Sequence, residues 1–220
     1  MKKNTILSIG LLLAVAQTLF AQDINWRAED KHKNVLQAYF GADYSSYYGI
    51  AYGRLVQIKG QSLAIGSELT VPFGSDIADD WRLRTSVQTE LLRHNLFALT
   101  LKPALIVRRY ASPMARIYNM GADITVLYGY QGIRWGLVAL ANYDRSISAH
   151  FAHRMLKEDY PAIQDGWYNT RSGNFKFGMR AGYSGKSWSG FLVLGKHFGQ
   201  NFSDNPTLPF FADLSLQKRF

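Results

Sequence analysis

The last ten residues of the chain alternate between apolar and polar side chains. Ala212, Leu214, Leu216 and Phe220 fall on one side of an extended segment, and Asp213, Ser215, Gln217 and Arg219 fall on the other. A repeat of two residues is the repeat of a β-strand, whose successive side chains point to opposite faces of a sheet. The end of the chain is therefore predicted to be a strand with one apolar and one polar face, and it closes on an aromatic residue.

The same repeat recurs along most of the chain and predicts ten strands in all. The predicted strands are residues 35–44, 47–58, 62–73, 81–93, 96–109, 116–130, 133–151, 167–183, 187–199 and 210–220. Pro103 falls inside the fifth of them. Because proline has no backbone N–H, it would remove one hydrogen bond from the ladder at that point.

The predicted connections alternate in length. The short ones are residues 59–61, 94–95, 131–132 and 184–186, and the longer ones are residues 74–80, 111–115, 156–166 and 200–208. Aromatic side chains gather where the strands end: Phe73, Trp81, Tyr110, Tyr118, Trp167 and Phe210 near the longer loops, and Phe97, Tyr128, Trp135, Tyr183, Trp188 and Phe220 near the short turns. Two such belts are typical of a sheet that meets two membrane interfaces.

These patterns predict a closed sheet in lipid. Lipid cannot pair with backbone N–H and C=O groups, so a membrane-spanning sheet must close on itself. We predict an all-β fold, an antiparallel transmembrane β-barrel of about ten strands. Eight strands is the alternative, with the first hairpin outside the membrane. The apolar faces would contact lipid and the polar faces would line the lumen. A soluble barrel or sandwich, with its apolar faces inward, is the competing interpretation.

The closing strand resembles that of small bacterial outer-membrane β-barrel proteins, whose last strand is amphipathic and ends in phenylalanine. Lys218 stands on the apolar face where that family usually has another hydrophobic residue. The resemblance implies a location in the cell outer membrane of a Gram-negative envelope. It also implies contact with outer-membrane lipid and lipopolysaccharide, and recognition of Phe220 by the barrel assembly machinery.

The first residues have the pattern of an export signal. Lys2 and Lys3 precede an uncharged apolar run, residues 6–15, and small residues follow. Cleavage is expected after Ala21, with Ala16 as the alternative. The run is shorter than the roughly 20 apolar residues of a membrane-spanning helix. The chain is thus divided into a signal peptide (1–21), a periplasmic leader (22–34) and the barrel (35–220).

Composition excludes several kinds of chemistry. The chain has no cysteine, which rules out disulfides, a cysteine-linked lipid anchor and thiol catalysis. A formal net charge of +9 would suggest nucleic acid for a soluble protein, but no nucleic acid partner is expected for an exported barrel. His32, His94 and His197 lack metal-ligand spacing, and there is no glycine-rich phosphate loop, so neither a metal nor a cofactor is expected.

The polar strand faces are rich in charge. The predicted lumen charges are Glu68, Arg82, Arg84, Glu90, Lys102, Arg108, Asp123, Arg134, Asp144, Lys176 and Arg180, with Asp213 and Arg219 on the last strand. They could line a pore or a substrate groove, or they could pair with one another and plug the lumen. The second interpretation is favoured, because side chains largely fill a barrel of eight to ten strands.

Residues predicted to lie at the outer rim could support a hydrolase. His150 and His153 are close in sequence to Asp159 and Asp165, while Asp76, Asp79 and Asp80 share a loop. The arrangement is similar to that of the omptins, ten-stranded outer-membrane proteases that use an Asp pair and a His-Asp pair. Ser146 and Ser148 near His150 suggest a Ser-His hydrolase, as in barrel lipid A deacylases. The weak catalytic candidates are His150, His153, Ser148, Asp79 and Asp80.

The function expected from these features is not catalytic. We expect an integral outer-membrane protein that binds a ligand or an unknown protein partner through the loops at residues 74–80, 156–166 and 200–208, or that serves as an envelope accessory. A rim hydrolase acting on lipid A or peptides, and a narrow pore, are the two alternatives.

Overall fold

The computed structural model describes residues 25, 32–43, 45–73, 79–170, 172–200 and 209–220. Its elements are β1 (Asn34–Asp43), β2 (Ser45–Ile58), β3 (Gln61–Pro72), β4 (Trp81–His94), β5 (Phe97–Ala111), β6 (Ala115–Gln131), β7 (Trp135–His153), α2 (Leu156–Asp159), β8 (Gly166–Asn169), β9 (Gly173–Ser184), β10 (Trp188–Phe198) and β11 (Phe210–Arg219). No helix within these ranges has the length and apolar character needed to cross a membrane. The predicted signal peptide and most of the predicted leader lie outside the described residues, as do residues 74–78 and 201–208 of the predicted loops.

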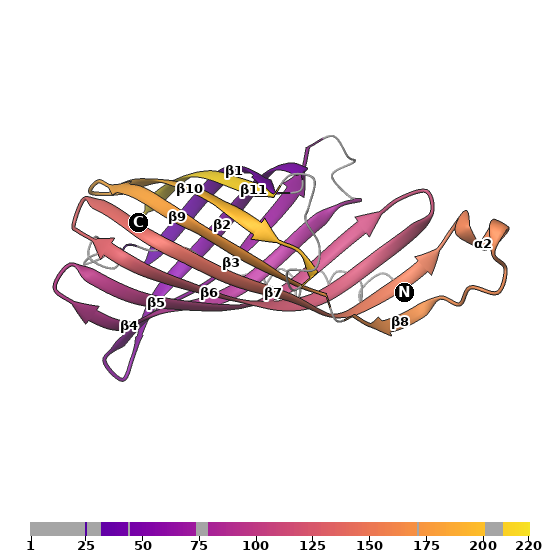
Figure 1. Ribbon diagram of the computed structural model, residues 1–220. Helices are drawn as coiled ribbons and strands as arrows, with labels where there is room; N and C mark the ends of the chain where they lie inside the picture. The colour runs from indigo at the N-terminus through magenta and orange to yellow at the C-terminus, as the bar shows by residue number, and fades with distance from the viewer. Residues whose placement is uncertain (1–24, 26–31, 44, 74–78, 171, 201–208) are drawn as a thin grey trace, which may run out of the picture.

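Ten of the strands form a closed antiparallel ring (Figure 1). Each pairs with the next along the chain from β1 to β7, and the ring continues through β9, β10 and β11. It closes where β1 pairs with β11, from Val35 opposite Arg219 to Ala42 opposite Ala212. The prediction of a ten-stranded antiparallel barrel is confirmed. The eight-stranded alternative is wrong, because β1 and β2 are full members of the ring.

Short and longer connections lie at opposite ends of the barrel. The short turns after β2, β4, β6 and β9 share one end with the start of β1 and the end of β11. We call this the short-turn end and the other the long-loop end. In the first turn Lys59 and Gly60 have φ values of 51° and 82°, and Asn95 in the second has 53°. Positive φ at these positions suits tight hairpin turns that follow the twist of the strands.

One predicted strand is in fact two. The segment 167–183 divides into β8 and β9 around residues 170–172. The cause lies in the facing strand, because the β6–β7 ladder passes from Gly121 opposite Ser146 to Met120 opposite Ser148 and skips Ile147. Gly121 permits this bulge, since an added Cβ there would lie 2.6 Å from the carbonyl oxygen of Arg145. β8 pairs with β7 beyond the bulge, outside the ring.

The wall of the barrel is much taller on one side. β7 has 19 residues whereas β1 has 10, a difference of roughly 30 Å along the strand direction. The outer part of β7, α2 and β8 form an arm that projects past the other strands, at the right of Figure 1.

The outer surface is apolar. Side chains such as Phe40, Ile50 and Leu105 are 59%, 60% and 68% exposed. All six aromatic residues predicted near the short turns are exposed on this surface. Lys218, which interrupts the apolar face of β11, lies with its ammonium 5.5 Å from the centre of the Trp188 ring. An exterior of this kind needs apolar surroundings.

Pro103 does lie within a central strand. The β5–β6 ladder is continuous across it, with Pro103 opposite Ile124. The ladder to β4 breaks instead, running to Ser86 opposite Ala104 and resuming at Thr89 opposite Leu101. The missing donor therefore falls on the β4 side, where the ladder lacks two successive pairings.

Candidate functional site: a polar cup in the lumen

Glycines on the inner face make room for large inward side chains. A Cβ added to Gly41 would lie 2.4 Å from the ring of Tyr47, and one added to Gly49 would lie 2.3 Å from the ring of Tyr39. The two tyrosines therefore lie against bare backbone on their neighbouring strands, which only glycine allows at such distances.

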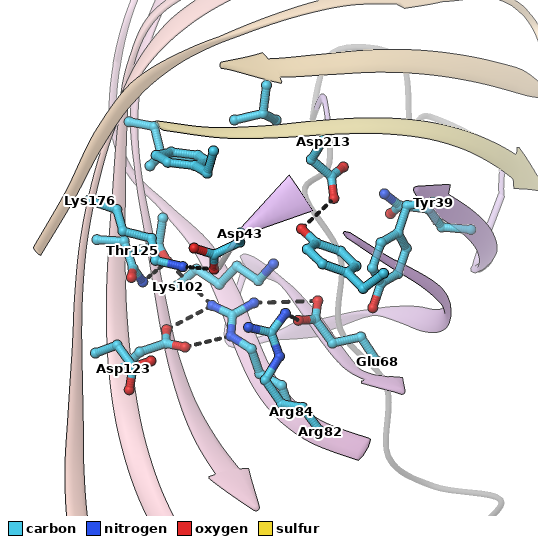
Figure 2. A pocket seen from close by; sticks show the side chains of 17 residues that line it. Tyr39, Asp43, Glu68, Arg82, Arg84, Lys102, Asp123, Thr125, Lys176 and Asp213 are labelled. Carbon is cyan, nitrogen blue, oxygen red and sulfur yellow. Dashed lines mark hydrogen bonds and ion pairs between the residues drawn. The ribbon is translucent and has the colours of Figure 1, made fainter. Parts of the chain in front are cut away.

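Ion pairs cross the middle of the lumen. Arg84 on β4 donates two hydrogen bonds to Asp123 on β6, from Nε to Oδ2 at 2.6 Å and from Nη2 to Oδ1 at 2.7 Å. Its Nη1 lies 3.5 Å from Oε2 of Glu68 on β3, and Arg82 approaches the other oxygen of Glu68 at 3.8 Å. Figure 2 shows the two guanidinium groups between the carboxylates. Two-pronged contacts of this kind offset much of the cost of removing the charges from water.

Further pairs lie towards the long-loop end. Asp43 at the end of β1 receives Lys176 of β9, and Nδ1 of His197 lies 3.1 Å from its other oxygen. Arg108 pairs with Asp144 and also donates to Oδ1 of Asn119 at 3.2 Å.

The two tyrosines of the inner face complete this set of contacts. The Tyr47 hydroxyl donates to Asp213 at 3.1 Å, and the Tyr39 hydroxyl lies 3.0 Å from that of Thr70. All ten strands of the ring contribute at least one side chain to these contacts or to the ion pairs in the middle of the lumen.

Two adjoining cavities lie among these residues. The central cavity has a volume of about 160 Å³ and the outer cavity about 380 Å³. Both are lined by Asp43, Tyr47, Arg82, Asp144 and Lys176. The outer cavity adds two aromatic rings, two amides and several hydroxyls: Trp81, Tyr110, Asn119, Asn174, Ser45, Thr70, Ser146 and Ser172. We call the two cavities together the cup.

The short-turn half of the lumen is packed shut. Gln88, Gln217 and Thr100 are 0% exposed, and Gln131 and Arg219 are 1% exposed. Arg219 donates to the carbonyl oxygen of Gly185, which anchors it to the β9–β10 turn. Side chains that line a water-filled channel would be accessible to solvent, so these residues close the lumen to water.

Other side chains reinforce this closure. Arg180 lies over the ring of Phe191 at 5.1 Å and is 4% exposed. Asn25 is 5% exposed and donates to the carbonyl oxygen of Gly132 at 2.9 Å, so it lies against the β6–β7 turn. Asn25 belongs to the predicted leader, and it contacts the barrel.

The predicted lumen charges occupy three kinds of place. Seven line the central cavity: Glu68, Arg82, Arg84, Lys102, Asp123, Asp144 and Lys176. Asp213 joins them there, Arg108 lines the outer cavity, and Arg180 and Arg219 lie in the closed half. Glu90 pairs with Arg93 beside the β4–β5 turn, and Arg134 is exposed in the β6–β7 turn.

Sequence reasoning missed Asp43 and four aromatic side chains of the cup. Tyr39, Tyr47 and Asp43 share the inward positions of β1 and β2. Trp81 and Tyr110, which the sequence pattern places in an aromatic belt, line the outer cavity. The glycines opposite the tyrosines are the signal that could have found them, because a bare backbone position on a neighbouring strand marks space for a large side chain.

The rim candidates fall into two separate groups. Asp79 lies 3.3 Å from Nη2 of Arg109, and Oδ1 of Asp80 accepts a hydrogen bond from the backbone N–H of Ala111 at 2.8 Å. Both aspartates therefore brace the end of β5.

The other group lies on the arm. The Ser148 hydroxyl donates to the carbonyl oxygen of Tyr168 at 3.4 Å, and the His150 ring packs against Trp167 at 5.3 Å. Nδ1 of His153 lies 3.0 Å from Asp165. Each of these contacts joins β7 to β8 or to the segment before it, so the geometry holds the arm together. A hydrolytic site needs nucleophile, base and orienting group in one place.

Asp165 is the centre of a small charged cluster on the arm. Lys157 donates to it at 2.7 Å, and the backbone N–H of His153 donates at 2.9 Å. These hydrogen bonds hold the pKa of the Asp165 carboxyl below its usual range. Across the ranges that the structure describes, no three His, Asp or Glu side chains are grouped so that they could hold a metal ion.

Comparisons with known proteins add a likeness of fold. No protein-family model matches the chain, and no curated protein matches it. Among solved structures the chain is similar to a KdgM porin, with a TM-score of 0.40 and 7% sequence identity over 84% of this chain and 99% of that chain. The chain is a closed ten-stranded antiparallel β-barrel with an apolar exterior, the architecture of outer-membrane barrels.

Proposed function

We propose that this protein is an outer-membrane barrel that binds a small, neutral polar solute in the cup and does not conduct solutes freely. The observation that carries the proposal is the contrast within the lumen. At the long-loop end the lumen contains the cup, which is lined by polar side chains. At the short-turn end the lumen is packed, and Gln88, Gln131 and Gln217 there are at most 1% exposed. A barrel built in this way has a binding site with one entrance.

The charges of the cup favour a neutral ligand. Its cations are Arg82, Arg84, Lys102, Arg108 and Lys176, and its carboxylates are Asp43, Glu68, Asp123, Asp144 and Asp213. The two sets balance, and most of their members are joined in ion pairs. A strongly charged solute would therefore have to compete with pairs that already exist.

The lining indicates the chemistry of the solute. Trp81, Tyr47 and Tyr110 present flat apolar rings, while Asn119 and Asn174 present amides. Amphipathic rings beside hydroxyl and amide groups suit a molecule with many hydroxyls and one apolar face, such as a sugar. The outer cavity is of the size that small-molecule sites have.

The membrane placement is part of the proposal. It is supported by the closed ring, by the exposed apolar belt and by the export signal expected at the N-terminus.

Two measurements on the folded protein test the proposal. Equilibrium dialysis with radiolabelled glucose, lactose and glycine should show saturable binding of a sugar and none of glycine. Trp81→Ala should abolish the binding, while Trp188→Ala, on the outer surface, should leave it unchanged. In planar bilayers the wild-type protein should give no steady conductance steps. Binding of neither sugar, or regular steps, would contradict the proposal.

A narrow pore is the second candidate. It is favoured by the adjoining cavities, which lead from the long-loop end as far as the central ion pairs. It would require the layer of Gln88 and Gln217 to move aside, and steady conductance in the bilayer measurement is the result that would select it.

A further inference from the structure

Exposed cations encircle the short-turn end. Lys59, Arg134 and Lys186 lie in three different hairpin turns, and all three are exposed. Three more exposed cations lie where the terminal strands reach the same end: Lys33, Arg54 and Lys218. We call these six residues the basic ring.

Acidic side chains do not offset this charge. Within the described ranges, Glu90 is the single acidic residue at the short-turn end, and it pairs with Arg93, which is outside the basic ring. The long-loop end differs, because its exposed basic residues Arg154 and Lys157 are interspersed with acidic ones such as Glu158, Asp159 and Asp165. The positive field is thus concentrated at one end of the barrel.

The basic ring lies at the edge of the apolar exterior. Trp135, Tyr183 and Trp188 are exposed on the outer surface at the same height, beside the turns that carry Arg134 and Lys186. The Lys218 ammonium lies directly over the Trp188 ring. Long basic side chains beside interfacial aromatics place their charges at the level of lipid headgroups.

We propose that the basic ring binds the phosphate headgroups of anionic phospholipids in the leaflet around the short-turn end. Its distribution favours lipid over a protein partner. Charges that serve a protein interface are expected in a patch on one side, whereas a leaflet meets the barrel on all sides. The basic ring has residues in three of the four hairpin turns and at the closure between β1 and β11, so its charges are spread around the barrel. Basic side chains at a membrane surface are attracted to anionic lipids. The inference does not depend on what the cup binds.

Native mass spectrometry of the folded, full-length protein tests this. The protein in detergent is mixed with equimolar phosphatidylglycerol and phosphatidylethanolamine of identical acyl chains, and the retained lipids are counted. We expect phosphatidylglycerol to exceed phosphatidylethanolamine by roughly fivefold or more. The preference should fall as ionic strength rises from about 0.05 M to about 0.5 M.

Matched triple variants locate the site. The variant K59N/R134Q/K186Q removes three charges of the basic ring, and asparagine is chosen at residue 59 because it tolerates positive φ. The control R145Q/R154Q/K196Q removes three exposed charges elsewhere. Folding is checked by the mobility of unheated samples on a gel.

The ring variant should lose the preference and the control should keep it. Equal retention of the two lipids by the wild-type protein would overturn the proposal, and this outcome does not depend on whether any variant folds. A preference that survives in the folded ring variant, or that is lost equally in the control, would also overturn it.

Discussion

The two halves of the lumen are lined by inward side chains of the same ten strands. The half at the long-loop end contains cavities, whereas the half at the short-turn end is packed. The cup is lined by charged pairs and tyrosines, some of which lie against glycine backbone. The closed half is filled by amides, hydroxyls and arginines that have almost no exposure. The cup is crossed by ion pairs, whereas the closed half is filled mainly by amides and hydroxyls, with Arg180 packed over Phe191 and Arg219 bound to the carbonyl oxygen of Gly185. In a barrel of this size, the identity of the inward residues decides whether a given layer is open, and strand number alone does not.

The largest effect is expected from removing the closure. Gln88→Ala together with Gln217→Ala deletes two amides that are 0% exposed in the closed half. The lumen should then become continuous, so planar bilayers should change from silence to steady conductance steps. The control is Gln57→Ala with Gln61→Ala, two exposed residues beside the first turn. A double variant that folds and stays silent would contradict the prediction, because it would show that Thr100, Gln131 and Arg219 close the lumen without the two amides.

The central ion pairs should dominate stability within the cup. Arg84→Ala leaves Asp123 and Glu68 buried without their main cation, and losing one partner of such a pair costs about 3–5 kcal/mol of unfolding free energy. Urea unfolding in lipid vesicles measures this. Arg93→Ala breaks the pair with Glu90, which is more exposed, and should cost at most about 1 kcal/mol. Similar costs for the two variants would show that water reaches the ion pair in the lumen as readily as the pair beside the turn.

Packing in the closed half can be tested with two neighbouring glycines. A Cβ at Gly182 would lie 2.3 Å from the ring of Phe191, so Gly182→Ala should cost about 1–3 kcal/mol through overpacking. At Gly190 the nearest atom to an added Cβ is 3.9 Å away, so Gly190→Ala should change stability by less than about 1 kcal/mol. The same unfolding assay reads both. Equal effects would mean that Phe191 moves aside freely.

The smallest effect is expected on the arm, far from either half. The Asp165 carboxyl has a lowered pKa in the folded arm, so its contribution is present above the unfolded value of 3.8 and is lost as the pH falls below it. The protection of the amides in residues 156–169 against hydrogen exchange, relative to the intrinsic rate at each pH, should therefore fall below about pH 4 while the barrel stays protected. Asp165→Asn should remove this pH dependence, and Asp159→Asn should preserve it.

Much of the ring could be predicted because its rule is local. Alternation fixes which side of each strand is apolar, and Glu68, Arg84 and Asp123, which fall on the predicted polar faces, line the central cavity. The break between β8 and β9 could not be predicted from its own residues, since it follows from the bulge at Ile147 on the facing strand. Strand pairing depends on both segments, so a bulge in one strand can interrupt its neighbour without any signal in the neighbour's own residues.

The place of the aromatic residues in the cup could not be predicted for a different reason. A tyrosine suits a membrane interface as well as a lumen, so its position in the sequence does not distinguish a belt from the outer cavity, which Tyr110 lines. Tyr39 and Tyr47 have the same ambiguity, which the glycines opposite them resolve. The two halves of the lumen could not be distinguished either, because closure depends on how the side chains of all ten strands meet on the axis.

The break beside Pro103 marks the ladder at which the barrel should open first. The β4–β5 ladder lacks two pairings at Pro103 and Lys102 and shifts register once, between Glu90 and Leu92, so two irregularities fall in one seam. A closed ring opens most readily at the ladder that has the fewest hydrogen bonds. We expect backbone amide protection to be lower along this seam than along the continuous β5–β6 ladder. Opening at the seam would leave one ten-stranded sheet with β4 and β5 at its edges, because β1 stays paired with β11.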